Sequence, residues 1–352
     1  MSDNVQDIEK RNFLKAMLFS TFLPLMSISE AETKDFSFLN TPVNIIIPKE
    51  YDPSLDPSNQ YRLTQATLSY IEENYRDGNI PLWGKKFKEV NFEKRIGNIV
   101  LLICAGIKTY QDIYPIDPTW VVAQIMIESL FYEFAVSRSL AVGICQFIQP
   151  TAHEYGMVCA GDLPEHTKTP YQLPEFAEKT KEYYQLKHEK KQYQQQPHDL
   201  LSLEESLKII LRDDCSGQKE KAQNHFKYLK KGEEFDKKIS KTQKEYRKYI
   251  EINTKGKDIF DDTGFIERFD ERLTHQKPVM AMVKMLAEHL QARNGNILAA
   301  AAGYNAGLSR TQDKWIYKPY GKIPYIRETV DYLSHLLINH YEITARINRM
   351  SL

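Results

Sequence analysis

The sequence lacks the patterns by which proteins most often hold metal ions. Its four cysteines, Cys104, Cys145, Cys159 and Cys215, form no Cys-x-x-Cys pair, and there is no His-x-x-x-His pattern. We therefore expect no metal site and no cofactor. Four cysteines are also too few for a disulfide scaffold. In an exported protein, Cys159 and Cys215 could still form one bridge.

The chain also has no excess of charge and no long apolar run. Its 47 basic and 47 acidic residues give a net charge of zero, so no overall field attracts nucleic acid or an anionic membrane. We therefore predict no nucleic-acid partner. The 352 residues are enough for one large domain or two modest ones, with 42% hydrophobic residues to build a core.

The first 31 residues predict an export signal. Lys10 and Arg11 precede an uncharged run over 16–28, and Ser29-Glu30-Ala31 offers the small residues that a signal peptidase needs. The run is shorter than the roughly 20 residues that span a bilayer. We expect cleavage after Ala31 and a periplasmic or otherwise exported location; the alternative is an amphipathic or buried N-terminal helix.

Residues 117–152 contain the strongest candidate for chemistry. Asp117-Pro118 suits the start of a helix, on which Val121, Ile125 and Glu128 share one face. A carboxylate at the end of an apolar stripe is desolvated, which moves its pKa from about 4.3 towards 6 and suits a general acid. On spacing alone, an exposed glutamate near a helix end is an alternative.

Three ordered blocks of sequence support a catalytic role for Glu128. The first runs without a gap from Glu128 to Gln146 and is followed by Thr151-Ala152; the second is AAAGYNAG at 300–307, and the third covers 323–333. They resemble the soluble lytic transglycosylase family, whose blocks read E-S…S-x-x-x-A-x-G-L-M-Q, A-A-Y-N-A-G and P-x-x-E-T-x-x-Y-V. One extra residue lies inside the third block.

The sequence departs from the family pattern at several places. Leu140 and Cys145 stand where many relatives have Gly and Met, and Tyr132-Glu133 replaces the usual Asn-Pro. Pro150 comes one place later than the family's proline. None of these changes removes the acid, but they bear on the shape of the sugar subsites.

The resemblance implies a mostly α, lysozyme-like transglycosylase domain with a large helical insertion and a partly irregular N-terminal extension. Relatives cross the Lys-, Glu-, Gln- and Tyr-rich interval 158–265 with a short loop. There, Ser202 and Glu205 form a capping-box pattern, and alternating charges favour a solvated helix face over contact with wall polymer or a protein of the cell envelope. We expect a separate lobe, removable over 165–265. The predicted segments are 1–31 (signal), 32–90 (extension), 91–157 (first domain part), 158–265 (insertion) and 266–346 (second domain part).

The resemblance also implies a reaction on the glycan strands of peptidoglycan. Glu128 would protonate the oxygen between N-acetylmuramic acid and N-acetylglucosamine and then, as a base, help the sugar's own C6 hydroxyl close onto C1, giving a 1,6-anhydro product without water. A hydrolytic muramidase, with Glu133 as a second carboxylate, and a weakly catalytic wall-binding assembly protein are the alternatives.

Supporting roles are implied for five further residues. Tyr304 would hydrogen-bond Glu128, Ser137 and Ser139 would contact the sugar, and Gln146 would line the cleft. Asn305 is expected to hold the turn at Tyr304. Four aromatic residues could stack on sugar faces or pack in the core: Trp315, Tyr317, Tyr320 and Tyr325.

Overall fold

The computed structural model describes residues 45–162, 174–212, 217–314 and 318–350. The predicted export signal lies outside these residues, as does Cys215. The chain divides into two compact units, one of Met1–Tyr132 with His275–Leu352 and one of Glu133–Thr274. Within the described residues the regular structure is helical, with isolated β-bridges and no strand, which confirms the mostly α prediction. None of the described helices has the length and apolar character needed to cross a bilayer.

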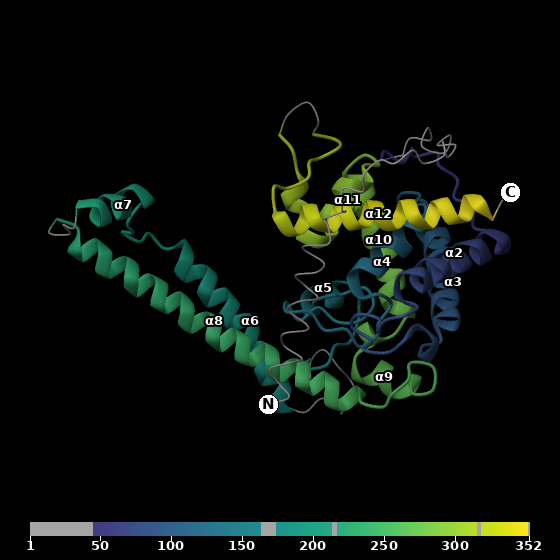
Figure 1. Cartoon of the computed structure of the whole chain (residues 1–352), viewed down its shortest axis with the longest axis horizontal. Helices are drawn as coiled ribbons and strands as arrows, with labels where there is room; N and C mark the ends of the chain where they lie inside the picture. Colours follow the sequence, from purple (N-terminus) through teal and green to yellow (C-terminus); the bar gives the residue numbers. More distant parts are fainter. Residues whose placement is uncertain (1–44, 163–173, 213–216, 315–317, 351–352) are drawn as a thin grey trace. The chain divides into compact units, whose positions relative to one another are not determined.

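The first unit is an assembly of α-helices and short 3₁₀-helices (Figure 1). Its elements are α2 (Pro57–Tyr75), η2 (Phe87–Glu89), α3 (Phe92–Tyr110), α4 (Pro118–Ser129), α10 (Gln276–Ala292), α11 (Ile297–Ala306), η5 (Leu308–Thr311) and α12 (Arg327–Arg349). Before α2, Ile46 makes an isolated bridge with Asn296 and no strand forms in the described part of the extension.

Helix α4 lies at the centre of this unit. Every residue from Thr119 to Met126 is buried, as expected for a helix that is apolar on nearly all sides. Helices α3 and α12 both pack against it. On α11, four consecutive alanines are fully buried, and their small side chains allow α10 to pack closely: Ala299, Ala300, Ala301 and Ala302.

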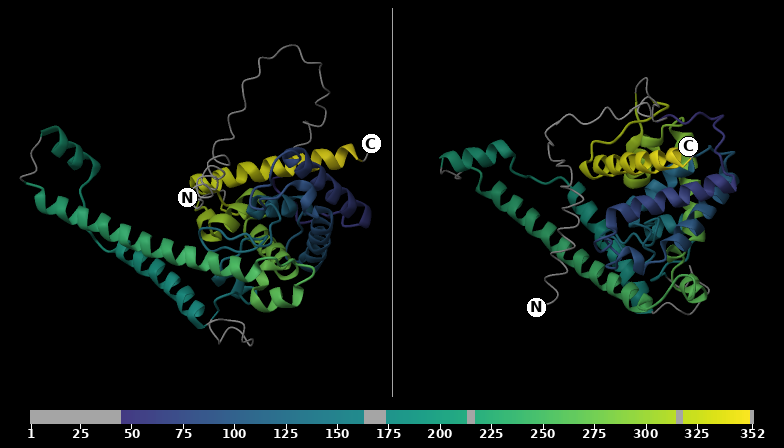
Figure 2. Two further views of the ribbon diagram at one scale, coloured as in Figure 1. Left: turned by 60° about the horizontal axis from the view of Figure 1, so that its bottom comes forward. Right: turned by 45° about the vertical axis from the view of Figure 1, so that its right-hand side comes forward.

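The second unit contains a long helical hairpin. Its elements are α5 (Gln149–Glu154), α6 (Pro174–Gln195), α7 (Leu203–Arg212), α8 (Lys219–Thr254), α9 (Thr263–Phe269) and η4 (Glu271–Leu273). Ion pairs join Lys179 to Glu245 and Lys190 to Asp236, so α6 and α8 run antiparallel, as Figures 1 and 2 show. At 1.5 Å per residue, α8 is about 54 Å long. The capping box predicted at Ser202 and Glu205 is present.

The inner end of this hairpin belongs to the core of the second unit. Tyr183 of α6 and Tyr246, Tyr249 and Ile250 of α8 are buried in one cluster with loop residues Leu140 and Val142 and with Phe269 and Leu273. The predicted insertion is therefore helical, but its inner end packs with residues on both sides of 158–265. The structure argues against removing residues 165–265, because that cut takes Tyr183, Tyr246, Tyr249 and Ile250 out of the cluster.

Candidate active site

The start and the end of α4 fix the position of Glu128. Asp117 accepts a hydrogen bond from the amide of Thr119 at 2.8 Å, which confirms the predicted cap. The helix ends at Leu130, whose φ of 49° and ψ of 41° are left-handed, and Phe131 follows at φ 61°. Two successive non-glycine residues in this region are uncommon and strained. Burial of both side chains, 4% and 0% exposed, holds the turn directly after Glu128 in place.

A neighbouring aromatic side chain also supports this turn. The indole Nε1 of Trp83 donates to the carbonyl oxygen of Leu130 at 2.9 Å, and its ring lies 5.0 Å from that of Tyr132. The backbone after the candidate acid is therefore tied to a distant segment of the same unit. We expect little freedom for the carboxyl group to drift from its position.

The Glu128 carboxyl group is half-buried and has one hydrogen-bonding tyrosine. Tyr332 of α12, itself 7% exposed, donates from its hydroxyl to Oε1 of Glu128 at 2.8 Å. Burial raises the pKa of Glu128 most, the bond from Tyr332 lowers it, and the charge of Glu328 raises it. Together they place this pKa at about 7. At neutral pH a large share of the molecules therefore carries the proton that a general acid needs.

Tyr332 is a candidate site residue that the sequence does not reveal. It stands in the third sequence block, whereas the resemblance implies Tyr304 as the donor to the acid. Tyr304 is half-buried at the end of α11, and its contact with Glu128 stays a prediction. Asn305 accepts at 2.9 Å from the hydroxyl of Thr329, so it joins α11 to the first turn of α12. The tyrosine at the end of the E-T-x-x-Y pattern was the signal available in the sequence.

The carboxylate whose charge acts on Glu128 is Glu328, in the first turn of α12. The sequence had suggested Glu133 as a second carboxylate. Glu133 is 1% exposed and belongs to the second unit.

The loop over 137–147 carries the three other candidate residues, all in the second unit. The hydroxyl of Ser137 accepts from the amides of Ser139 at 3.2 Å and Ala141 at 3.0 Å. The side-chain amide of Gln146 donates to the carbonyl oxygen of Gly143 at 2.8 Å. Ser137 and Gln146 therefore shape the loop themselves, while the side chain of Ser139 is exposed.

A buried arginine fastens this loop to the hairpin. Arg272 is 0% exposed and donates to both carboxylate oxygens of Asp270, to the carbonyl oxygen of Phe147 at 3.2 Å and to the hydroxyl of Tyr246 at 2.6 Å. Gly143, at φ 81°, passes so close that a Cβ there would lie 1.8 Å from the carbonyl oxygen of Arg272. Helix α8 therefore supports the loop that carries Ser137 and Gln146.

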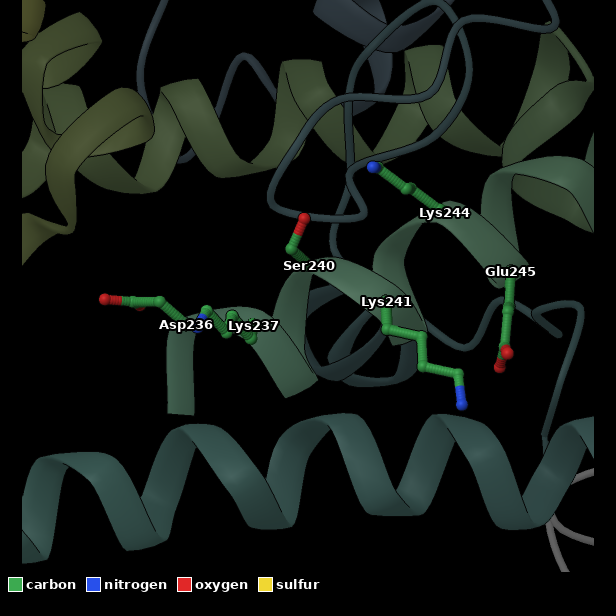
Figure 3. Close-up of a pocket in the computed structure, with 6 residues that line it drawn as sticks. All are labelled: Asp236, Lys237, Ser240, Lys241, Lys244 and Glu245. Carbon is green, nitrogen blue, oxygen red and sulfur yellow. The ribbon is translucent and has the colours of Figure 1, made fainter. Parts of the chain in front are cut away.

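Two of the four aromatic candidates lie among the described residues. Tyr325 is fully exposed and Tyr320 is 39% exposed, so both stay candidates for sugar stacking, whereas Trp315 and Tyr317 lie outside the described residues. Figure 3 shows a hollow lined by residues of α8, none of which is a candidate of the sequence analysis: Asp236, Lys237, Ser240, Lys241, Lys244 and Glu245.

Comparison with protein families places part of the chain. Residues 106–198 match the family model described as the transglycosylase SLT domain. No curated protein and no solved structure matches the chain. The matched range includes Glu128 and the loop over 137–147, and it ends before α11 and α12. The roles of Tyr304, Asn305 and Tyr332 therefore depend on the structure and on the two later sequence blocks.

Proposed function

We propose that the protein is a peptidoglycan-acting enzyme of the lytic transglycosylase type, because residues 106–198 match the transglycosylase SLT domain. The protein cleaves the β-1,4 bond between N-acetylmuramic acid and N-acetylglucosamine and leaves 1,6-anhydro ends. The observation that carries this proposal is the Glu128 carboxyl group, half-buried, raised in pKa to about 7 and bonded by Tyr332.

In the first step Glu128 acts as the general acid. Since Tyr332 donates to Oε1, the proton of the neutral carboxyl group resides on Oε2, which gives it to the glycosidic oxygen as the C1–O bond breaks. The carboxylate that forms is stabilised by the same tyrosine hydroxyl. The hydrogen bond therefore strengthens as the proton leaves.

In the second step the Glu128 carboxylate acts as the base. It takes the proton of the C6 hydroxyl while that oxygen attacks C1, so Glu128 returns to its starting form and no water is consumed. A single carboxyl group is enough for both steps because the nucleophile is part of the substrate. The exposed Ser139 is proposed to contact the glycan. Contacts of Ser137, Gln146, Tyr304 and Asn305 with the glycan stay predictions of the resemblance.

Hydrolysis on the same fold is the second candidate, because the charge of Glu328 acts on Glu128. An inverting hydrolase uses a second carboxylate to activate water. Mass spectrometry of purified sacculi digested with the full-length protein distinguishes the three candidate functions. Anhydro ends support the proposal, reducing ends show a muramidase, and intact glycan shows a weakly catalytic wall-binding protein.

We also propose that the protein acts outside the cytoplasm, since its substrate is the cell wall and residues 1–31 have the pattern of an export signal. N-terminal sequencing of the exported protein should find a chain that begins near Glu32. An exported chain that still carries residues 1–31 would refute cleavage after Ala31.

A further inference from the structure

Three side chains of different chemistry meet in the second unit. His153 lies near the end of α5, and Cys159 and Asp162 lie in the turn that follows. One imidazole nitrogen, the thiol sulfur and a carboxylate oxygen all lie within 4.8 Å of one another. Cys159 and Asp162 are 0% exposed, and the His153 side chain is 27% exposed.

Hydrogen bonds fix these groups before any ligand arrives. Asp162 Oδ2 accepts from the amide of Cys159 at 2.7 Å, and its Oδ1 lies 2.7 Å from Nε2 of His153. The side-chain amide of Gln149 also donates to Oδ1. Asp162 therefore orients His153 and Cys159, and Gln149 orients Asp162. Metal ligands in proteins are usually held by such hydrogen bonds from neighbouring residues.

The charges around the turn favour a cation. The amide of Ala160 donates to Asp270 at 3.0 Å, and the amide of Val158 donates to Glu271 at 2.7 Å, so two more carboxylates lie beside the turn. Arg272 supplies one positive charge, which is engaged with Asp270. Burial, followed by the charges of these neighbouring acids, raises the pKa of the Cys159 thiol, and Arg272 opposes that effect. A cation bound beside the sulfur would instead lower the pKa of the Cys159 thiol, because it stabilises the thiolate.

A nucleophilic role does not fit the same three residues. A Cys–His–Asp arrangement cleaves a substrate only if the sulfur can reach it. Because Cys159 is 0% exposed, a substrate has no access to its sulfur. The burial that excludes nucleophilic catalysis is compatible with a structural ion.

We propose that His153, Cys159 and Asp162 bind one divalent transition-metal ion of the Zn²⁺ type. Thiolate, imidazole and carboxylate are the three donor types that zinc takes in proteins, at about 2.0–2.3 Å in a tetrahedral arrangement. Such bonds place the donor atoms about 3.3–3.8 Å apart. The longest distance between donor atoms, up to 4.8 Å, would therefore shorten. The 2.7 Å distance between Nε2 of His153 and Oδ1 of Asp162 would lengthen. A water molecule completes the four-coordinate ion.

Protons balance in this step. The Cys159 thiol releases its proton to solvent as the sulfur binds the ion, and the neutral imidazole shifts its remaining proton to the nitrogen that does not ligate. Binding is therefore tighter at higher pH. The ion would join the end of α5 to the turn that follows it, and this role does not depend on the reaction proposed for Glu128.

Elemental analysis and cobalt substitution of the full-length protein test the site. We expect one equivalent of zinc per chain, a lower midpoint of thermal unfolding after treatment with a chelator, and recovery on adding Zn²⁺. The Co²⁺-loaded protein should show the sulfur-to-cobalt charge-transfer absorption. Cys159→Ser should lose that absorption, whereas Cys104→Ser, which removes a buried thiol from α3, should keep it.

Three results would overturn the site: no stoichiometric zinc or cobalt in the folded protein, a charge-transfer absorption that survives Cys159→Ser, or a Cys159–Cys215 disulfide in the exported chain. Cys215→Ser serves as a second control and should keep the absorption. Should Cys159→Ser fail to fold, X-ray absorption of the zinc-loaded parent decides instead. One sulfur atom bound to the zinc supports the site, whereas no sulfur or two sulfur atoms would contradict it.

Discussion

Opposing influences act on the carboxyl group of Glu128. Burial and the charge of Glu328 favour the neutral acid, whereas the hydroxyl of Tyr332 favours the carboxylate. The balance places the pKa at about 7, so that the group can both give and take a proton near neutral pH. An enzyme that uses one residue as acid and then as base needs such an intermediate pKa.

Changing each of the two neighbours should move the pH dependence in opposite directions. Tyr332→Phe removes a bond to the carboxylate, so the pKa of Glu128 rises and the alkaline fall of kcat/KM moves to higher pH. Glu328→Gln removes a negative charge, so the same fall moves to lower pH. Because the bond strengthens in the transition state, Tyr332→Phe should also lower kcat by about 10- to 100-fold.

Profiles of kcat/KM against pH, measured on soluble glycan fragments, check this prediction. Tyr75→Phe is the matched control, since Tyr75 is a tyrosine at the end of α2 and should leave the profile unchanged. Shifts in the same direction for Tyr332→Phe and Glu328→Gln would contradict the account of the Glu128 environment.

Residue by residue, the sequence predicts what is local and misses what is distant. Glu128 was found because its helix face and its sequence block are contiguous. Its donor Tyr332 lies 204 positions away, and only the packing of α12 on α4 brings the two together. The cluster of His153, Cys159 and Asp162 was missed for another reason: its spacing follows none of the usual metal-binding patterns.

The loop over 137–147 shows how an element tolerates departures from a family pattern. Leu140 stands where relatives have glycine, and it adopts φ 61°, which glycine reaches without strain. Its side chain is 2% exposed in the core cluster, and burying a leucine contributes about 2 kcal/mol. That gain offsets a backbone strain of about 1–2 kcal/mol. Burial therefore replaces conformational freedom at this position.

At Gly143 the same loop has no room for a side chain. Gly143→Ala combines an unfavourable φ with a clash against the carbonyl oxygen of Arg272, and we expect a loss of unfolding free energy of about 2–4 kcal/mol. Gly256→Ala is the matched control, because Gly256 has φ 73° but no atom within 4 Å of an added Cβ. It should cost about 1 kcal/mol.

Chemical unfolding of the two variants measures this difference. Equal losses would show that the close approach of Gly143 to Arg272 is not part of the folded protein. The sequence predicts α4, which precedes this loop, because its cap at Asp117 is adjacent to the helix in the sequence. The attachment of the loop to Arg272 and Tyr246 arises from packing, and no sequence motif predicts it.

Across the whole chain, the hairpin of α6 and α8 has two parts with different roles. Its inner end lies in the core of the second unit, while its outer end carries α7. Several large apolar side chains of α7 are exposed: Leu203 at 77%, Ile210 at 74% and Leu211 at 83%. An exposed apolar patch of this kind marks a surface for contact with another molecule. We therefore predict that the outer hairpin contacts the wall or a cell-envelope protein.

Removing only the outer hairpin should separate these roles. Because Lys190 and Asp236 form an ion pair, a short Gly/Ser turn can replace residues 191–235 and leave Tyr183 and Tyr246 in place. We expect a folded protein that cleaves short glycan fragments at a rate within a few-fold of the parent. Its activity on intact sacculi should fall more than its activity on fragments.

Circular dichroism and parallel assays on fragments and sacculi check this prediction. A full-length variant with Leu203, Ile210 and Leu211 changed to serine is the control for the apolar surface and should reproduce the loss on sacculi. If the shortened protein is folded but inert on fragments, the outer hairpin supplies part of the active site and the assignment is wrong.

The catalytic role of Glu128 is the central claim, and product analysis of Glu128→Gln tests it most directly. Glutamine keeps the shape of the side chain but has no proton to give, so we expect a folded protein that makes about 10³-fold fewer anhydro ends from sacculi than the parent. Glu93→Gln, at an exposed position in the first turn of α3, should match the parent. Mass spectrometry counts the ends. A Glu128→Gln protein that forms anhydro ends within a few-fold of the parent rate would contradict the account.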